Sequence, residues 1–425
     1  MNDSYDVMVI GGGPAGLAAA IAAHEGGAAV LIVEREAQLG GILKQCVHDG
    51  FGLERYGEAL TGPEYAARDA NRVNEVGIDV ATGTYVLDAE RSDGTCTLTL
   101  TNADGIWRVT SKTLVLATGC RERTACQVLI HGDRPSGVFT AGCAQNLVNL
   151  QGMLPAHRVA ILGSGDIGLI MARRLTLEGA EVVGVFEAKP QPSGLSRNIA
   201  QCLDDFYIPL HLSTTVTRTL GKDRLEAVEV CAVDDQMRPI AGTERLVECD
   251  TLLLSVGLIP ENELAERLGV PLSPLTHGPI VDQHLQTEVD GIFAAGNCLF
   301  VNDLVDYVSE QGRRAGAEAA RVALHGQNRM LAQVRVGAGV ASCIPQRVDR
   351  EADLSEVTFF LRSAETYRKV EVMFVDKGEV LQKRRLVAVR PSEAIRLTVD
   401  LSEMGDDVWV SMAGGTSILK GRDHV

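Results

Sequence analysis

Short uninterrupted apolar runs alternate with longer apolar segments through much of the chain. One set is DVMVI (6–10), PAGLAAAIAA (14–23) and AAVLIV (28–33), and a second is RVAIL (158–162), DIGLIMARRLTL (166–177) and EVVGVF (181–186). Short apolar runs are typical of strands covered on both faces, and the longer segments are typical of helices. The alternation predicts an α/β fold that contains two strand–helix–strand units of one kind.

Each of the two strand-to-helix junctions carries a glycine-rich turn. The spacing GxGxxG is formed by Gly11, Gly13 and Gly16 in the first turn and by Gly163, Gly165 and Gly168 in the second. The first glycine makes the turn, the second lets a pyrophosphate approach the backbone, and the third lets the helix pack closely. Further candidate contacts lie inside the turns, namely Pro14 and Ala15 in the first and Asp166 and Ile167 in the second.

An acidic residue ends the second strand of each unit. Glu34 and Glu187 follow the last glycine of their turns by close to the roughly 20 residues that separate a Rossmann turn from its ribose-binding acid. One such turn is weak evidence, because structural glycine turns are common, but two turns with strand, helix and acid in register predict two bound dinucleotides. A carboxylate repels a 2′-phosphate, so Glu187 favours NAD, while nearby Arg197 keeps NADP open.

Two further strand ends make the pattern specific. They are TLVLATGCRER (113–123), with Ala117, Thr118 and Gly119, and DGIFAAGNCLFVNDLVDYVSEQGRRAG (290–316), with Gly296 and Asn297. Together with the glycine turns they resemble the two-dinucleotide-binding-domain flavoproteins, the pyridine nucleotide-disulfide oxidoreductase-like superfamily that includes glutathione and thioredoxin reductases. The resemblance covers about residues 5 to 325. LLLSVGLIPENEL (252–264), which contains Gly257, is a weaker match.

The resemblance implies FAD in the first site and a nicotinamide dinucleotide in the second. It implies that Arg35 and Gly41 belong to the FAD site, that the ATG strand marks where the chain leaves the flavin domain, and that the later strand contacts the ribityl chain. The helix after that strand would point its positive end at the flavin ring. Asn297 stands where the family usually has Asp, and an amide still donates to and accepts from ribityl hydroxyls.

Several stretches most resemble one sub-branch of the family. They are GGILKQCVHDGFG (40–52), TAGCAQNLVN (140–149), GSGDIGLIMARRLTLEGA (163–180) and GNCLFVNDLVDYVS (296–309). That branch comprises bacterial FAD/NAD-dependent oxidoreductase subunits associated with glycerol-3-phosphate dehydrogenase and akin to the FAD subunits of hydrogen cyanide synthase and opine oxidase. The resemblance implies electron transfer between NAD and a partner dehydrogenase, and it implies a further partner, a cysteine-rich iron–sulfur subunit.

Cys46 and His48 are the candidate catalytic residues. In disulfide reductases two redox cysteines follow the ribose glutamate and a glycine pair, whereas this stretch has only Cys46. Relatives with a single redox cysteine include NADH peroxidases and coenzyme A disulfide reductases, so Cys46 is either redox-active or a packing residue. His48 either assists the thiol or donates a proton, or it is a hydrogen-bonded structural histidine.

The patterns predict four segments. Residues 1–125 and 262–330 form a split FAD domain with a small β-meander, and 126–261 form an inserted NAD domain. Residues 331–425 alternate apolar and polar side chains with period two, which predicts a small β-sandwich. Its use is open between an interface, with a second copy or a partner subunit, and a structural cap.

Composition narrows the function further. A net charge of −16 argues against a nucleic-acid partner. Ten cysteines without any CxxC give no zinc or iron–sulfur pattern and favour a reducing cytoplasm. The uncharged run 7–23 contains three consecutive glycines and Pro14, which favours a turn between strand and helix over membrane insertion.

Three functions remain after these arguments. The first is a flavin and NAD subunit of a larger dehydrogenase. The second is a stand-alone single-cysteine NADH oxidase, peroxidase or disulfide reductase that uses Cys46. The third, of another class, is a non-catalytic FAD-binding scaffold.

Overall fold

The computed structural model describes residues 2–414 and 416–417. It divides into two compact units, of which one comprises the chain up to Cys120 and again from Pro260 onward. The other is the inserted segment Arg121–Ile259. The two short strands β7 (Cys120–Glu122) and β17 (Leu258–Pro260) pair where the chain passes from one unit to the other and back.

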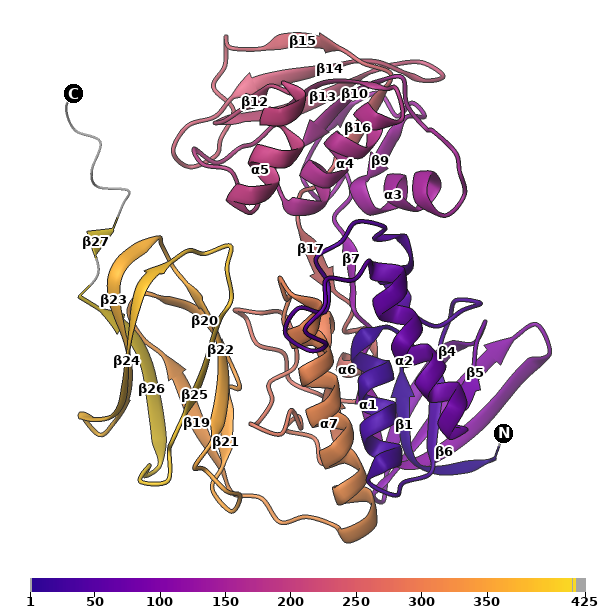
Figure 1. The fold of residues 1–425 in the computed structure, drawn as a ribbon, viewed down its shortest axis with the longest axis vertical. Coiled ribbons are helices and arrows are strands. Elements are labelled where there is room, and N and C mark those ends of the chain that lie inside the picture. The colour runs from indigo at the N-terminus through magenta and orange to yellow at the C-terminus, as the bar shows by residue number, and fades with distance from the viewer. Residues whose placement is uncertain (1, 415, 418–425) are drawn as a thin grey trace. The chain divides into compact units, whose positions relative to one another are not determined.

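The first unit is built on a seven-stranded sheet (Figure 1). Its strands are β1 (Ser4–Ile10), β2 (Val30–Val33), β3 (Asp79–Ala81), β4 (Tyr85–Ser92), β5 (Thr95–Asn102), β6 (Gly105–Leu116) and β18 (Ile292–Ala294). Strands β3, β2, β1, the second half of β6 and β18 run parallel, and β4 and β5 pair antiparallel with the first half of β6. This arrangement confirms the predicted Rossmann-like sheet with a β-meander insert.

The first unit also contains helices. They are α1 (Pro14–Glu25), α2 (Gly62–Val76), α6 (Glu263–Arg267) and α7 (Val305–His325), with the short 3₁₀ helices η1 (Gly41–Gln45) and η3 (Gly296–Cys298). Helices α1 and α7 lie side by side (Figure 1). A Cβ added to Gly312 or Gly316 would lie 2.1 or 2.0 Å from a carbonyl oxygen of α1. Only glycine permits this approach, which fixes α7 beside the first glycine turn.

The C-terminal part of the first unit forms two facing sheets. One contains β19 (Leu331–Val336), β21 (Arg347–Asp349), β23 (Tyr367–Asp376), β24 (Glu379–Val389), β26 (Asp407–Ala413) and β27 (Thr416–Ser417), and the other β20 (Val340–Ile344), β22 (Val357–Ser363) and β25 (Ile395–Val399). Inward side chains of both, such as Phe359 and Phe374, share one core. The predicted β-sandwich is confirmed.

The second unit repeats the α/β design. Its parallel sheet has the order β12-β11-β10-β16-β9, formed by β9 (Val138–Thr140), β10 (Arg158–Leu162), β11 (Glu181–Phe186), β12 (Leu210–His211) and β16 (Thr251–Leu254). A smaller sheet contains β8 (His131–Gly132), β13 (Thr214–Gly221), β14 (Leu225–Ala232) and β15 (Arg245–Glu248). The helices are α3 (Ala141–Asn149), α4 (Asp166–Leu177), α5 (Ser196–Cys202) and η2 (Asp204–Phe206).

Within the described residues, no helix has both the length and the apolar character that crossing a membrane requires.

Two candidate dinucleotide sites

The first glycine turn joins β1 to α1 and leaves its backbone open to a ligand. Gly11 has a φ of +105°, and a Cβ there would lie 2.3 Å from the carbonyl oxygen of Ala117. A Cβ on Gly16 would lie 1.8 Å from the oxygen of Gly11. Gly13 faces Gly41, whose own Cβ would lie 2.9 Å from the Cα of Gly13. These close approaches require glycines, and they form the cradle that a pyrophosphate needs.

Glu34 lies buried at the end of β2, beside the first turn. One of its carboxylate oxygens accepts from the backbone N–H of Gly12 at 2.6 Å, and the other from that of Glu36 at 2.7 Å. A carboxylate offers about four acceptor positions, so both oxygens retain capacity for ribose hydroxyls. Its neighbour Arg35 instead forms an ion pair at 3.1 Å with Glu261.

The segment through which the chain leaves the first unit, at Thr118 and Gly119, is hydrogen-bonded to the segment through which it returns, at Glu261. The hydroxyl of Thr118 donates to the carbonyl of Glu261 at 2.7 Å, and the N–H of Glu261 donates to the carbonyl of Gly119 at 3.0 Å. Gly119 adopts a φ of +74°. The ATG strand end is therefore fixed by hydrogen bonds to the segment through which the chain returns.

Amide side chains organise the loop between β18 and α7. Asn297 donates to the sulfur of Cys120 at 3.7 Å and accepts from the backbone N–H of Asn302 at 3.0 Å. Gln311 accepts from the N–H of Gly296 at 3.1 Å and donates to the side chain of Asn302 at 3.0 Å. These bonds hold Gly296 and Asn297 in place through a side chain of α7.

The first turn of α7 carries a buried acid, Asp306. One oxygen accepts from the backbone N–H of Glu54 at 3.1 Å, and the other is buried without a hydrogen-bond partner. A buried carboxylate oxygen normally has a partner, so this atom fits a polar group of a ligand. The carboxylate also offsets part of the positive end of α7. The glycine cradle and this unpaired oxygen both fit FAD in the first unit.

Cys46 and His48 lie at and just after the end of η1. The thiol of Cys46 donates to the carbonyl of Ile42 at 3.5 Å, and burial raises its pKa to about 11. The His48 ring bonds the carbonyl of Asp49 at 3.0 Å and lies 4.9 Å from the ring of Phe51. A thiol with a raised pKa is the opposite of an activated redox cysteine, whose thiolate is stabilised by positive charge.

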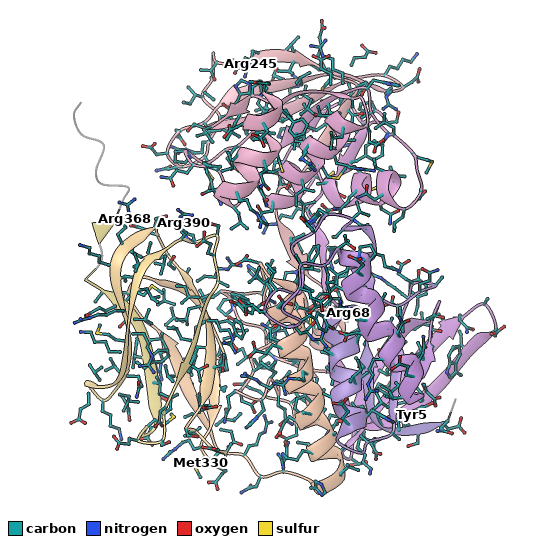
Figure 2. The ribbon with its side chains drawn as sticks, in the orientation of Figure 1. Tyr5, Arg68, Arg245, Met330, Arg368 and Arg390 are labelled. Atoms are coloured by element: carbon teal, nitrogen blue, oxygen red, sulfur yellow. The ribbon has the colours of Figure 1, made fainter. Side chains whose placement is uncertain are left out.

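A network of side chains, partly buried at Arg55, Asp69 and Tyr65, holds the loop that follows Cys46, and no sequence pattern predicted it. Arg55 bonds Asp69 of α2 at 2.6 Å, which raises the pKa of the Arg55 guanidinium despite its desolvation. Tyr65 donates to Ser309 of α7 at 2.9 Å. Arg68, labelled in Figure 2, bonds Glu58 of the same loop at 2.6 Å. No local motif marks such pairs, because the partners come from three separate elements.

The second glycine turn joins β10 to α4 with the same geometry as the first. Gly163 has a φ of +95°, and a Cβ there would lie 2.1 Å from the carbonyl oxygen of Ser255. Gly168 donates its N–H to the Ser255 hydroxyl at 3.2 Å, and its Cβ would lie 2.7 Å from the Ser255 Cβ. In the same unit Gly257 has a φ of +98°. The two turns are therefore copies of one device in structure as well as in sequence.

Glu187 lies buried at the end of β11, as Glu34 does at the end of β2. One carboxylate oxygen accepts from the N–H of Ser164 at 3.0 Å and from its hydroxyl at 2.5 Å, and also from the Ser193 hydroxyl at 3.1 Å. The other accepts from the N–H of Lys189 at 3.0 Å. The two serines were not predicted, and the only sequence signal for Ser164 is its place inside the glycine turn.

Asp166 is the first residue of α4 and holds a segment against the second turn. Its Oδ1 accepts from the N–H of Leu195 at 2.8 Å and from the Asn198 amide at 2.7 Å. A Cβ on Gly194 would lie 2.8 Å from the Ser164 carbonyl oxygen and 2.9 Å from Asp166 Oδ1. Residues 193–198 therefore pack directly on the glycine turn.

This combination of two glycine turns, two buried acids and two Rossmann-like sheets defines a protein with one site for FAD and one for a pyridine nucleotide. The family model described as pyridine nucleotide-disulphide oxidoreductase matches residues 5–326. The chain belongs to this family, whose members are FAD-dependent oxidoreductases that also bind a pyridine nucleotide. The resemblance noted in the sequence is confirmed.

The chain is also similar in sequence to subunits of a known synthase and a known oxidase. The chain is 29% identical over 289 residues to the HcnB subunit of hydrogen cyanide synthase from Pseudomonas protegens, an alignment that covers 63% of this chain and 59% of the relative. It is 26% identical over 317 residues to one of the subunits of opine oxidase from Agrobacterium tumefaciens, covering 70% and 62%. The chain thus spans about three fifths of the length of these relatives.

A solved structure shares the fold. Thioredoxin reductase of T. acidophilum superposes with a TM-score of 0.62 at 22% identity, covering 76% of this chain and 100% of that one. This likeness confirms the predicted fold class.

Proposed function

We propose that the protein transfers hydride between NAD(H) and FAD as the flavin- and NAD-binding subunit of a multi-subunit dehydrogenase. The observation that carries the proposal is the presence, in one chain, of two structurally matched glycine turns, each with a buried glutamate at the end of the following strand. Such a pair is what a protein needs to bring two dinucleotides into one reaction.

Residues of the first unit would hold FAD. Gly11, Gly13 and Gly41 would leave room for the pyrophosphate, and Glu34 would accept from the ribose. Asn297 would hydrogen-bond the ribityl chain. Bound FAD supplies the hydride chemistry, and the protein supplies alignment, exclusion of water and local charge.

Glu187 supports NAD over NADP as the second dinucleotide. Its carboxylate is buried and takes part in at least four hydrogen bonds from the chain, so it is fixed in place at the end of β11. A 2′-phosphate at this position would bring a second anion close to a charge that cannot swing away. The expected cost is several-fold in affinity for NADPH relative to NADH.

The proposed role in a larger assembly draws on the relatives, two of which are named as subunits of hydrogen cyanide synthase and opine oxidase. We infer a partner dehydrogenase of the glycerol-3-phosphate or amine and amino-acid type, together with a cysteine-rich iron–sulfur subunit. Nine of the ten cysteines lie outside the stretch around Cys46, and none forms a CxxC, so this chain would leave a cluster to its partner.

An anaerobic titration with NADH tests the proposal against its alternatives. The purified flavoprotein and a Cys46→Ser variant are titrated while the flavin absorbance is followed. The proposal predicts full bleaching in both, with slow turnover until a partner dehydrogenase and its electron acceptor are added.

The other outcomes identify the competing functions. A long-wavelength charge-transfer band, together with loss of disulfide or peroxide turnover in Cys46→Ser, would assign the single-cysteine reductase or peroxidase function instead. A flavin that NADH does not reduce in either protein would leave the scaffold function.

A further inference from the structure

The two glycine turns differ in one charged residue. The first turn of α1 contains Pro14 at its start and no acidic residue. The first turn of α4 contains Asp166 in the corresponding position. Both helices begin directly after the middle glycine of their turn, at Gly13 and Gly165. The N-terminus of such a helix carries a partial positive charge and is where a dinucleotide pyrophosphate lies.

The contacts of Asp166 keep its carboxylate fixed and do not neutralise it. Both of its hydrogen-bond donors, the N–H of Leu195 and the amide of Asn198, are uncharged. Gly194 packs between Asp166 and the Ser164 carbonyl, so the carboxylate has little room to rotate away. A fixed anion therefore remains at the helix end that would otherwise attract phosphate.

The two sites share the main parts of the glycine turn, so the Asp166 variants below, and not the comparison between sites, isolate the effect of this residue. Each has a positive-φ first glycine, a glycine that packs the helix on the strand, and a buried glutamate for the ribose. A charge at the first helical turn typically changes affinity for an anion by about two- to fivefold. Direct repulsion with the two phosphates adds to this.

We propose that Asp166 weakens the second site so that its nicotinamide dinucleotide exchanges rapidly. This inference rests on the proposed function, in which FAD stays bound and NAD(H) binds and leaves in every cycle. Asp166 is a positioning residue in this scheme: it also holds residues 193–198, and with them Ser193, beside Glu187.

The test is the dissociation constant of NAD⁺ for the FAD-loaded, oxidised protein, measured by titration calorimetry. NAD⁺ does not react with the oxidised flavin, so the measurement reports binding alone. Asp166→Asn keeps the size and the acceptor oxygen of the side chain and removes its charge. The expected result is a dissociation constant about two- to tenfold lower than that of the wild type at low salt. The difference should shrink as salt is added, because salt screens the phosphates from the carboxylate.

Two control variants separate the effect of the Asp166 charge from the effect of its hydrogen bonds to residues 193–198. Asn198→Ala removes one bond to Asp166 without changing any charge, and Glu181→Gln removes an exposed acid from β11 of the same unit. Neither should tighten NAD⁺ binding. Equal tightening in Asn198→Ala would overturn the proposal, since the contacts and not the charge would then set the affinity.

Failure of the proposed Asp166 role and failure of the proposed function give different results. If the wild type binds NAD⁺ and Asp166→Asn binds it equally or more weakly, the role of Asp166 is wrong and the proposed function stands. If the wild type does not bind NAD⁺ and is not reduced by NADH, the proposed function itself is wrong. Should Asp166→Asn not fold, Asp166→Ser also removes the charge while keeping an acceptor, and the same comparison applies.

Discussion

Two buried glutamates, Glu34 and Glu187, are each satisfied mainly by backbone or serine donors of their own turn. This preorganises the carboxylates, because they need no rearrangement before a ribose binds. It also gives each buried carboxylate the hydrogen-bond partners that a buried polar group needs. Each acid is thus held in place by hydrogen bonds from the glycine turn that lies beside it.

Glu187→Gln should change which dinucleotide the protein prefers. The amide has one acceptor oxygen in place of two and no negative charge, so binding to a ribose hydroxyl weakens while repulsion of a 2′-phosphate disappears. The KM for NADH should rise about tenfold, and the ratio of NADPH to NADH efficiency should rise with it. Steady-state rates with both nucleotides and an artificial acceptor measure this, with Glu178→Gln as the control. An unchanged NADPH-to-NADH ratio would remove Glu187 as the basis of the NAD preference.

Cys46 should react slowly with alkylating agents at neutral pH. Burial raises its pKa to about 11, so at pH 8 roughly a thousandth of the thiol is ionised. Its labelling by iodoacetamide should rise steeply between pH 8 and 10, because the thiolate fraction grows tenfold for each pH unit below the pKa. Peptide mass spectrometry follows each cysteine, with the exposed Cys126 as an internal reference. Fast labelling of Cys46 at pH 7 would restore it as a redox candidate.

Among individual residues, the sequence predicted the turn glycines, because the backbone geometry of the turns allows only glycine there. Gly11 and Gly163 adopt positive φ and Gly16 and Gly168 meet backbone or Ser255 atoms, so no other residue fits and the spacing is visible in the sequence. The Asp306 bond to Glu54 joins residues about 250 positions apart, and no local pattern encodes such a partner.

The packing of α7 on α1 is the element-level feature on which the first site depends. Gly312 and Gly316 face the backbone of α1, and Gly296, just before α7, would place a Cβ 2.8 Å from that of Ala15. The periodic sequence predicted a helix after the AAG strand, and it predicted the strands from their apolar runs. It did not predict this glycine face, because small residues at helical spacing also occur in exposed helices.

Gly312→Ala should destabilise the first unit and release FAD. The new methyl group would lie 2.1 Å from the Ala15 carbonyl oxygen, so α7 must move away from α1. Such overpacking costs about 1–3 kcal/mol of unfolding free energy. Ala317→Val adds methyl groups on the exposed side of α7 and should cost much less. Denaturant unfolding and the flavin content after gel filtration measure both effects. Equal unfolding free energies of the two variants would show that α7 can move away from α1 without loss of stability.

Within the first unit, the C-terminal sandwich contacts the loop that leads into α7. Arg362 of β22 bonds the Val301 carbonyl at 2.9 Å and Asp303 at 2.6 Å, and its guanidinium lies 5.3 Å from the centre of the Phe300 ring. The N–H of Ala394 bonds the other oxygen of Asp303 at 2.7 Å. The sequence left the sandwich open as an interface or a cap, and these contacts add a third role as a support for the flavin-site loop.

Arg396 of β25 extends the same support to the helix itself. It bonds Glu310 at 2.9 Å, and Glu310 also pairs with Arg314 one turn further along α7. Period-two alternation predicted the sandwich strands because each strand buries one face. It could not predict which outward side chains reach α7, since an outward arginine in a strand looks the same whether it meets water or a helix.

Arg362→Ala should therefore loosen FAD although the residue lies in the C-terminal sandwich. The change removes the guanidinium from Asp303 and from the Val301 carbonyl, at a cost of about 2 kcal/mol for a partly buried charged pair. The loop through Asn297 and Asn302 would lose its outer support, so FAD should dissociate several-fold faster and at a lower temperature. Flavin fluorescence during heating measures the release. Arg335→Ala, which breaks a more exposed pair with Asp407 in the facing sheet, should leave FAD release unchanged. If both variants release FAD alike, the effect is a general loss of sandwich stability; if only Arg362→Ala does, the sandwich acts on the flavin site through this loop.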